Sequence, residues 1–324
     1  MSSTPTLHIV TGKGGTGKTT VAAALAMALA GRGQKVLLCE VEGRQGIAQL
    51  FDVAPLPYEE RRIATGLGGG EVYALAIDPE SALLEYLEMF YRLGRAGKAL
   101  DRFGIIDFAT TIAPGVRDVL LTGKVYEIAR RQGAKNEAGP TYDAIIMDAP
   151  PTGRITRFLN VNSEVAGLAK VGPIRRQADS IMQLLRSDAT RVHLVTVLEE
   201  MPVQETLDGV AELTGERLPV GHVIVNLVRP ALVTAATATA LDDDDFLDAR
   251  LPELLAGARL DPSSADVLVA GGRGHLVRQA LQQGQRELLE QADPPMAELP
   301  LLDASVDAGA LLQLAEHLRS EGVA

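Results

Sequence analysis

The clearest chemical signal in the chain is a glycine-rich run near its start that ends in lysine and threonine. The run reads Gly12-Lys13-Gly14-Gly15-Thr16-Gly17-Lys18-Thr19-Thr20 and fits the pattern G-x-x-x-x-G-K-[ST]. Glycines allow successive backbone N–H groups to curl around a phosphate. Lys18 can then reach the β and γ phosphates, and Thr19 can offer its hydroxyl to Mg²⁺. The run therefore predicts a site for ATP and Mg²⁺.

A second chemical signal is an aspartate at the end of an apolar run. Tyr142–Met147 reads as a buried strand, and Asp148 follows it directly. A carboxylate in that place can hold Mg²⁺ beside a phosphate loop, either directly or through a water. The alternative is an aspartate that only caps the next loop. Together with the glycine-rich run, the pattern favours the magnesium role.

Short apolar runs separated by helical stretches must position these residues. Continuous rather than alternating apolarity is typical of parallel strands covered on both faces. The glycine-rich run lies between the first strand and a helix over Thr19–Ala30. We therefore predict an α/β fold with a doubly wound, mostly parallel sheet, the P-loop NTPase class. Six strands are expected, at Leu7–Thr11, Lys35–Glu40, Val72–Ile77, Tyr142–Met147, Arg191–Leu198 and Gly221–Asn226.

Two long segments exceed what a crossover between strands needs. Residues 79–139 carry apolar side chains at helical spacing, with a second helix over Val116–Arg131, and predict a helical subdomain inserted into a single domain, 1–324. Residues 230–295 predict a second helical excursion. It is interpreted either as solvated helices covering the sheet edge or as a surface for a partner. Gly66–Gly70 is expected to form a turn before a strand.

The second lysine of the glycine-rich run carries a family resemblance. Lys13, directly after the first glycine, makes the loop similar to the deviant P-loops of the MinD, ParA, nitrogenase iron protein and ArsA ATPases. The segment from Pro151 to Leu159 closely resembles the D-x-x-P-T-G-x-x-x-R-F-L segment of the ArsA family. That family includes the arsenite-pump ATPase and the ATPase that targets tail-anchored membrane proteins. In such families the extra lysine reaches the nucleotide of the facing subunit, which implies a dimer, either a homodimer or a heterodimer with a paralogous ATPase.

The resemblance also implies three further site residues. The aspartate of the family's switch I falls on Glu42, which would orient the attacking water, although its longer side chain and a missing proline argue for slow hydrolysis. Asn226 falls where the family's adenine-recognising asparagine lies; the alternative is a strand-end turn residue. Pro300 falls in the family's closing segment, where a proline region packs near the base. Ala113–Asp118 looks like the family's P-G-x-x-E helix start.

Other features of the sequence depart from the named family members. Arsenite binding needs soft thiolate ligands, and the chain has one cysteine, Cys39, which is expected to be a buried strand residue. A Cys-x-x-Cys pair for a metal-bridged dimer is absent from the sequence. Residues 79–139 contain one methionine, Met89, so a large methionine-rich groove for a membrane helix is not expected.

Composition limits the partners and the compartment. The formal net charge is −11 and the densest charge run, Asp242–Asp245, is acidic, which argues against nucleic acid. The longest apolar run, Val21–Ala30, is about half of what a membrane span needs, and no signal peptide is recognisable. We therefore expect a soluble, cytoplasmic protein that is not an integral membrane protein, with peripheral membrane association left open.

The leading hypothesis is an ArsA-like ATPase that acts on an unknown client or partner. Switches at Glu42–Ile47 and Asp148–Arg154 would couple the phosphate state to the helical subdomain. Lys13 and Lys18 would stabilise charge while Glu42 or Asp148 positions water. Two alternatives stay open. One is an ATP-binding regulatory or assembly subunit with little hydrolysis, and the other is a metabolic kinase or ligase with a second pocket of polar groups.

Overall fold

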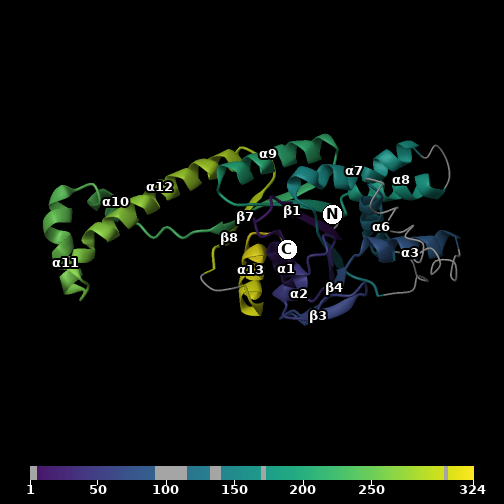
Figure 1. Ribbon diagram of the computed structural model, residues 1–324, viewed down its shortest axis with the longest axis horizontal. Coiled ribbons are helices and arrows are strands. Elements are labelled where there is room, and N and C mark those ends of the chain that lie inside the picture. Colours follow the sequence, from purple (N-terminus) through teal and green to yellow (C-terminus); the bar gives the residue numbers. More distant parts are fainter. Residues whose placement is uncertain (1–5, 92–114, 132–139, 169–172, 303–305) are drawn as a thin grey trace.

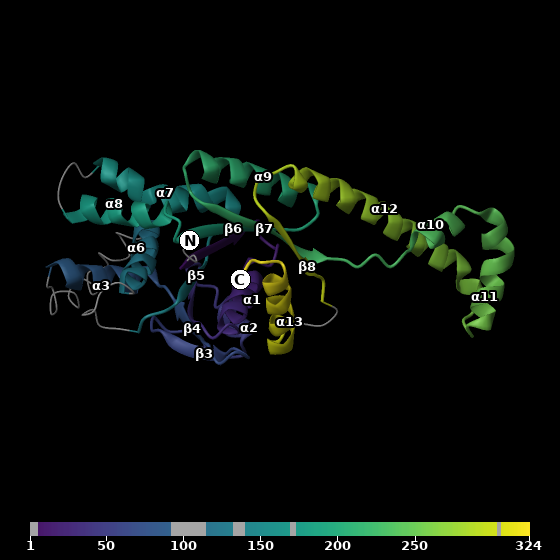
Figure 2. The same cartoon turned by 180° about the vertical axis from the view of Figure 1, so that it is seen from behind.

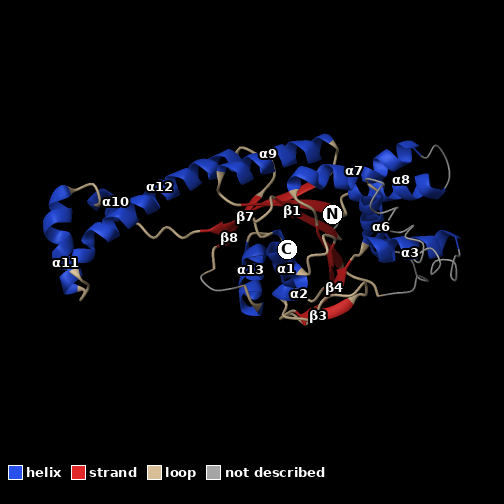
Figure 3. Ribbon diagram, viewed as in Figure 1, coloured by secondary structure: helices blue, strands red, loops and turns tan. Residues whose placement is uncertain are grey.

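The computed structural model describes residues 6–91, 115–131, 140–168, 173–302 and 306–324. Its centre is a single eight-stranded sheet with the order β3-β4-β2-β5-β1-β6-β7-β8, shown in red in Figure 3. All neighbouring strands are parallel except β3 and β4, which pair antiparallel. The strands are β1 Leu7–Gly12, β2 Lys35–Glu40, β3 Arg61–Thr65, β4 Glu71–Ala76, β5 Ala144–Asp148, β6 Thr190–Thr196, β7 Val220–Val228 and β8 Met296–Pro300. The predicted fold class is confirmed.

The two strands that the sequence analysis missed lie at the edges of the sheet. β3 reads Arg-Arg-Ile-Ala-Thr and alternates only weakly between polar and apolar residues, because it covers no central core. β8 reads Met-Ala-Glu-Leu-Pro, and its proline closes the strand at an edge, where a lost backbone donor is tolerated. Between β3 and β4, the predicted turn at Gly66–Gly70 packs on the end of α1. A side chain at Gly68 would place its Cβ 2.1 Å from the Gly31 carbonyl oxygen.

Helices cover both faces of the sheet. One face packs against α1 Lys18–Ala30, α2 Gly46–Leu50 and α13 Ala308–Ser320. The other face packs against α6 Val116–Arg131, α7 Thr152–Leu168, α8 Pro173–Leu185 and α9 Glu200–Gly215. Every residue of α1 from Val21 to Ala30 is buried, which explains why this helix is apolar all round. Cys39 is buried in β2, as predicted.

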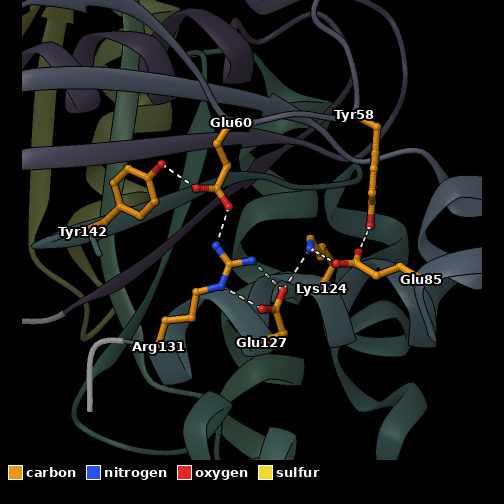
Figure 4. A network of polar contacts seen from close by, with 7 residues as sticks. All are labelled: Tyr58, Glu60, Glu85, Lys124, Glu127, Arg131 and Tyr142. Carbon is orange, nitrogen blue, oxygen red and sulfur yellow. Dashed lines mark hydrogen bonds and ion pairs between the residues drawn. The ribbon is translucent and has the colours of Figure 1, made fainter. Parts of the chain in front are cut away.

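The first helical addition contains α3 Pro79–Tyr91 and α6, which lie side by side at one end of the molecule (Figure 1). Its predicted remainder, 92–114 and 132–139, lies outside the described residues, as do Ala113 and Pro114 of the expected helix start. A polar network ties α3 and α6 to the sheet (Figure 4). Its members are Tyr58, Glu60, Glu85, Lys124, Glu127, Arg131 and Tyr142.

Arg131 lies at the centre of one half of this network. Its guanidinium contacts Glu60 at 2.6 Å and Glu127 at 2.7 Å. Burial raises the pKa of Glu127, but hydrogen bonds from Arg131 and Lys124 outweigh the burial and lower the pKa overall. The charges are therefore paired where they are partly withdrawn from water, which fixes the orientation of α6 against the sheet.

The second helical addition extends away from the sheet for most of its length. It consists of α10 Ala235–Ala240, η1 Phe246–Arg250, α11 Leu251–Gly257, η2 Pro262–Ser264 and α12 Ala265–Glu290. Figures 1 and 2 show α12 running outward from α9 as a long arm, on the side opposite to α3. Of the interpretation as solvated helices covering the sheet edge, the covering holds only for the end of α12, where Leu289 is buried beside Val223 and Arg286 pairs with Glu298; the rest of the arm is largely exposed.

Three histidine rings stack across neighbouring strands at the amino end of the sheet's central region. His193 on β6 stacks on His8 of β1 at 5.4 Å and on His222 of β7 at 5.8 Å between ring centroids. His8 Nδ1 and His193 Nε2 lie 3.1 Å apart, and the His222 backbone N–H donates to His193 Nδ1. Burial lowers the pKa of His193 strongly, and His8, His222 and Arg191 lower it further; burial also lowers the pKa of His222.

This histidine stack makes stability depend on pH. Unfolded histidines protonate near pH ~6.5, whereas His193 stays neutral in the folded protein to lower pH, so acid favours the unfolded state. We expect the free energy of unfolding to fall as pH drops below about 6.5, by up to ~1.4 kcal/mol per pH unit for each such histidine. Urea denaturation across this range measures the slope.

The matched pair of variants is His193→Gln and His317→Gln, since His317 is half-buried on α13 and lies outside the stack. The slope should be shallower in His193→Gln and unchanged in His317→Gln. Equal slopes in the wild type and His193→Gln would contradict this role of the stack.

Candidate nucleotide site

The predicted phosphate loop connects the end of β1 to the start of α1. Gly15 and Gly17 adopt positive φ angles of 90° and 85°, in the left-handed region that favours glycine. A Cβ at Gly12 would lie 2.1 Å from the Val195 carbonyl oxygen, so only glycine fits there. The Thr16 hydroxyl donates to the Lys13 carbonyl oxygen at 2.9 Å and closes the loop. These features form the backbone cradle that the sequence predicts.

Lys18, Thr19 and Asp148 come together at the base of the loop. Lys18 is buried at the first position of α1. The Thr19 hydroxyl donates to Asp148 Oδ2 at 2.7 Å. The second carboxylate oxygen, Asp148 Oδ1, is buried and has no hydrogen-bond partner among the described residues. A hydroxyl and a carboxylate with an unused oxygen are the hard oxygen donors that suit Mg²⁺.

The electrostatics of Asp148 reflect its burial. Burial raises the pKa of its carboxyl to about 6; the Thr19 hydrogen bond and Lys18 oppose this, and Glu40 and Glu42 add to it. The carboxylate is thus ionised at neutral pH but is costly to keep charged without a cation. The same interactions place Glu42 in the electrostatic surroundings of Asp148.

The predicted switch I follows β2 and lies against the phosphate loop. Glu40, the last residue of β2, accepts hydrogen bonds from the backbone N–H groups of Gln45 and Ile47. Gln45 adopts a positive φ of 56°, which turns the chain into α2. A Cβ at Gly46 would lie 3.2 Å from Thr19 Cγ2, so the switch packs directly on the site. Glu42 itself lies 3.7 Å from the Arg44 guanidinium.

Asn226 and Pro300 lie on neighbouring strands, Asn226 on β7 and Pro300 on the edge strand β8. Asn226 is buried within β7, which continues to Val228, and its Nδ2 donates to the Thr16 carbonyl oxygen at 2.9 Å. The structure thus places this amide against the phosphate loop, where it holds the loop. Pro300 is the last residue of β8 and lies opposite Val228 in the pairing register.

One site residue was missed by sequence reasoning. Lys13 Nζ lies 2.7 Å from Glu205 Oε2, and both side chains are partly exposed. Glu205 lies in the first turns of α9, the helix that follows β6. Because β6 is the parallel neighbour of β1, the carboxyl ends of both strands meet at one edge. The available signal was the position of Glu205 after a predicted strand, but strand order is needed to use it.

The fold and this cradle together define a P-loop nucleotide-binding protein. The family model described as anion-transporting ATPase matches residues 6–187. The chain therefore belongs to that family, the ArsA family.

Individual relatives agree with this assignment. The chain is 52% identical over 321 residues to ATPase BagA of Mycobacterium tuberculosis, covering 98% of this chain and 93% of that protein. It is 27% identical over 290 residues to an arsenical pump-driving ATPase of Escherichia coli, covering 81% of this chain and 46% of the pump ATPase. It is 29% identical over 207 residues to ATPase GET3 of Kluyveromyces lactis, covering 62% and 57% respectively.

Among the described helices, none combines the length and the apolar character that crossing a bilayer requires.

Replacing Asp148 by asparagine should separate stability from metal binding. A raised carboxyl pKa means that the folded protein prefers the neutral group, so the charged group costs stability at neutral pH. Asparagine keeps an acceptor for Thr19 without the charge. We expect Asp148→Asn to raise the free energy of unfolding near pH 7 by ~1–3 kcal/mol. This gain should shrink as pH falls through about 6, because the wild-type carboxyl then becomes protonated.

Chemical denaturation at several pH values tests this expectation, with Asp143→Asn, an exposed position just before the same strand, as the control. The same Asp148→Asn protein should bind ATP with less benefit from Mg²⁺ than the wild type. A loss of stability at neutral pH would contradict the assigned cause of the pKa shift.

Proposed function

We propose that this chain binds ATP with Mg²⁺ and hydrolyses it to ADP and phosphate. The observation that carries the proposal is the Thr19–Asp148 pair at the base of the phosphate loop, with one carboxylate oxygen left for a cation. Thr19 would hold Mg²⁺ directly and Asp148 directly or through a water. When bound, the ion neutralises charge that develops on the phosphates.

The residues of the loop would bind the phosphates, and the residues of the switches would orient the attacking water. Backbone N–H groups of Gly12–Thr20 and the Lys18 ammonium bind the phosphates and stabilise charge as the γ-phosphoryl bond breaks. Glu42 or Asp148 orients a water for in-line attack. Asn226 keeps one amide N–H and its carbonyl oxygen beyond its bond to Thr16, and these would pair with the adenine edge, with Pro300 beside the base.

We further propose that the active form is a dimer, with itself or with a paralogous ATPase, in which Lys13 reaches the nucleotide of the facing subunit. In the structure of the single chain, Lys13 is paired with Glu205. Because both side chains are partly exposed, the pair is worth little and can exchange for a phosphate partner. The likeness of this loop to deviant P-loops, in which the extra lysine reaches the nucleotide of the facing subunit, supports this arrangement.

Nucleotide state would reach the helical subdomain through switch I. The Gln45 side chain pairs with the Leu56 backbone, accepting from its N–H at 2.7 Å and donating to its carbonyl oxygen at 3.2 Å. Two residues further on, the Tyr58 hydroxyl donates to Glu85 on α3 at 2.6 Å. Movement of the switch would thus pull on α3, and the resulting change would act on a client or partner.

Two other functions remain as second candidates, each for a stated reason. Glu42 in place of an aspartate favours a regulatory or assembly subunit with little hydrolysis. A kinase or ligase would use an open cavity of about 480 Å³ beside switch I, whose lining includes Gln45, Asp78 and Arg117. Release of phosphate from ATP without any added acceptor would distinguish hydrolysis from a regulatory subunit, which releases little, and from a kinase or ligase, which needs an acceptor.

The sequence also supports proposals on the cellular compartment and on nucleic acid as a partner. We propose a cytoplasmic location and no nucleic-acid partner, since the net charge of −11 opposes phosphate backbones. Contact with a membrane surface is compatible with this proposal.

The two lysines of the loop should be separable by calorimetry and turnover. Lys18→Ala removes a charge from the β and γ phosphates, so we expect ATP affinity to fall ~100-fold or more. Lys13→Ala should keep ATP affinity within about tenfold but lose hydrolysis or nucleotide-dependent dimer formation. Lys35→Ala, at the opposite end of the sheet, is the control. Equal ATP affinity for Lys18→Ala and the wild type would overturn the site assignment.

A further inference from the structure

In the arm, residues 235–290, the long helix α12 has one face packed against the chain and another that is exposed. The inner face of α12 is held by the arm and by the segment that leads into it: Arg273 donates to the Leu241 carbonyl oxygen at 2.7 Å, and His275 accepts from the Leu232 N–H at 3.2 Å. Gly272 makes room for the Leu241 side chain, which a Cβ would meet at 2.9 Å. The opposite face of the helix is exposed.

That outer face repeats with the spacing of a coiled-coil seam. Steps of three and four residues alternate along α12, and every position in the series is exposed and uncharged; the residues are Val267, Ala270, Gly274, Val277, Leu281, Gly284 and Leu288. Val267, Val277 and Leu281 are 74%, 63% and 67% exposed. A repeat of 3.5 residues keeps one stripe facing a partner helix over its length. The seam spans ~32 Å at 1.5 Å per residue.

The glycines of the seam have no role within the single chain. A Cβ at Gly274 or Gly284 would meet nothing within 4 Å, in contrast to Gly272 on the inner face. An exposed glycine inside a helix costs ~1 kcal/mol relative to alanine. Small residues on a helix face are useful where a second helix must come close. The seam therefore points to a helix as the missing partner.

The order of large and small residues selects the partner. If α12 of a second copy runs antiparallel, Val267 faces Gly284 of that copy, Ala270 faces Leu281, and Gly274 faces Val277; the two-fold axis repeats each pair. Each of these layers then matches a large side chain with a small one, which fills space without overlap. We propose that α12 of a second copy of this chain packs antiparallel along this seam, forming a self-complementary interface.

A parallel pair would fit less well. It would place Gly274 against Gly274 and Leu281 against Leu281, leaving alternating gaps and bulges. The antiparallel pair sets the like-charged Asp266 and Glu287 near each other at the rim, where exposed charges are screened and cost little.

The interface is independent of the nucleotide site. The arm extends from the β8 side of the molecule, away from α3 and α6 (Figure 2). Arm pairing therefore needs no nucleotide, unlike the Lys13-mediated dimer proposed above.

Analytical ultracentrifugation without nucleotide tests the proposal. The wild type should sediment as a dimer, and Val277→Glu with Leu281→Glu should raise the dimer dissociation constant ~100-fold or more. Leu254→Glu is the control, since Leu254 is an equally exposed leucine of the same arm that lies outside the seam. Unchanged helical circular dichroism and retained ATP binding would show that the double variant is folded.

Cysteine pairing tests the direction of the helices, because Cys39 is buried and does not interfere. Gly274→Cys and Val277→Cys proteins should form a disulfide-linked dimer faster when mixed than either does alone. A wild type that is monomeric without nucleotide, as expected if a paralogous chain or a client helix covers the seam, would overturn the proposal. So would a dimer that survives both glutamates, or faster linkage within each single variant.

Discussion

The hydrogen bond from Thr19 to Asp148 joins the start of α1 to the end of β5, and the site depends on it. It exists because β1 and β5 are parallel neighbours in a register that sets Val10 opposite Asp148. The loop after β1 then has to turn back over the end of β5, which the glycines allow. The cost is a buried carboxylate whose pKa is raised to about 6 and whose second oxygen lacks a partner among the described residues. Buried carboxylates with a raised pKa are typical of functional sites, and the magnesium role proposed for Asp148 accounts for this one.

Local patterns predicted the parts of this site that are close in sequence. The cradle of Gly12–Thr20 and the strand that ends in Asp148 are both consequences of short-range chemistry, and the structure has them as expected. The bond from Asn226 to Thr16 joins residues 210 apart, and the pair of Lys13 with Glu205 joins residues 192 apart. Those contacts depend on the order of β1, β6 and β7 in the sheet, which spacing along the chain does not encode.

In the two helical additions, too, local structure was predictable from the sequence and long-range contacts were not. The apolar periodicity of 79–139 and 230–295 predicted helices, and the described parts are helical. Periodicity alone could not say which faces would be buried. In α6 the partner of Arg131, Glu60, comes from the sheet side and is far from it in sequence; Glu60 also accepts from the Tyr142 hydroxyl. In α12 the residues of the seam are exposed. A heptad pattern is common in buried helices, so the exposure seen in the structure was needed before the pattern could indicate a partner helix. The edge strands β3 and β8 were missed because edges lack the continuous apolarity of a covered strand.

The central claim is that this cradle breaks the terminal phosphate bond of ATP, and phosphate release measures it most directly. Purified chain should release phosphate from ATP only with Mg²⁺, with no acceptor added, and only when Lys18 is intact. Tight ATP binding without any release would contradict hydrolysis as the activity of the chain alone. Release that persists in Lys18→Ala would contradict the assignment of the site itself.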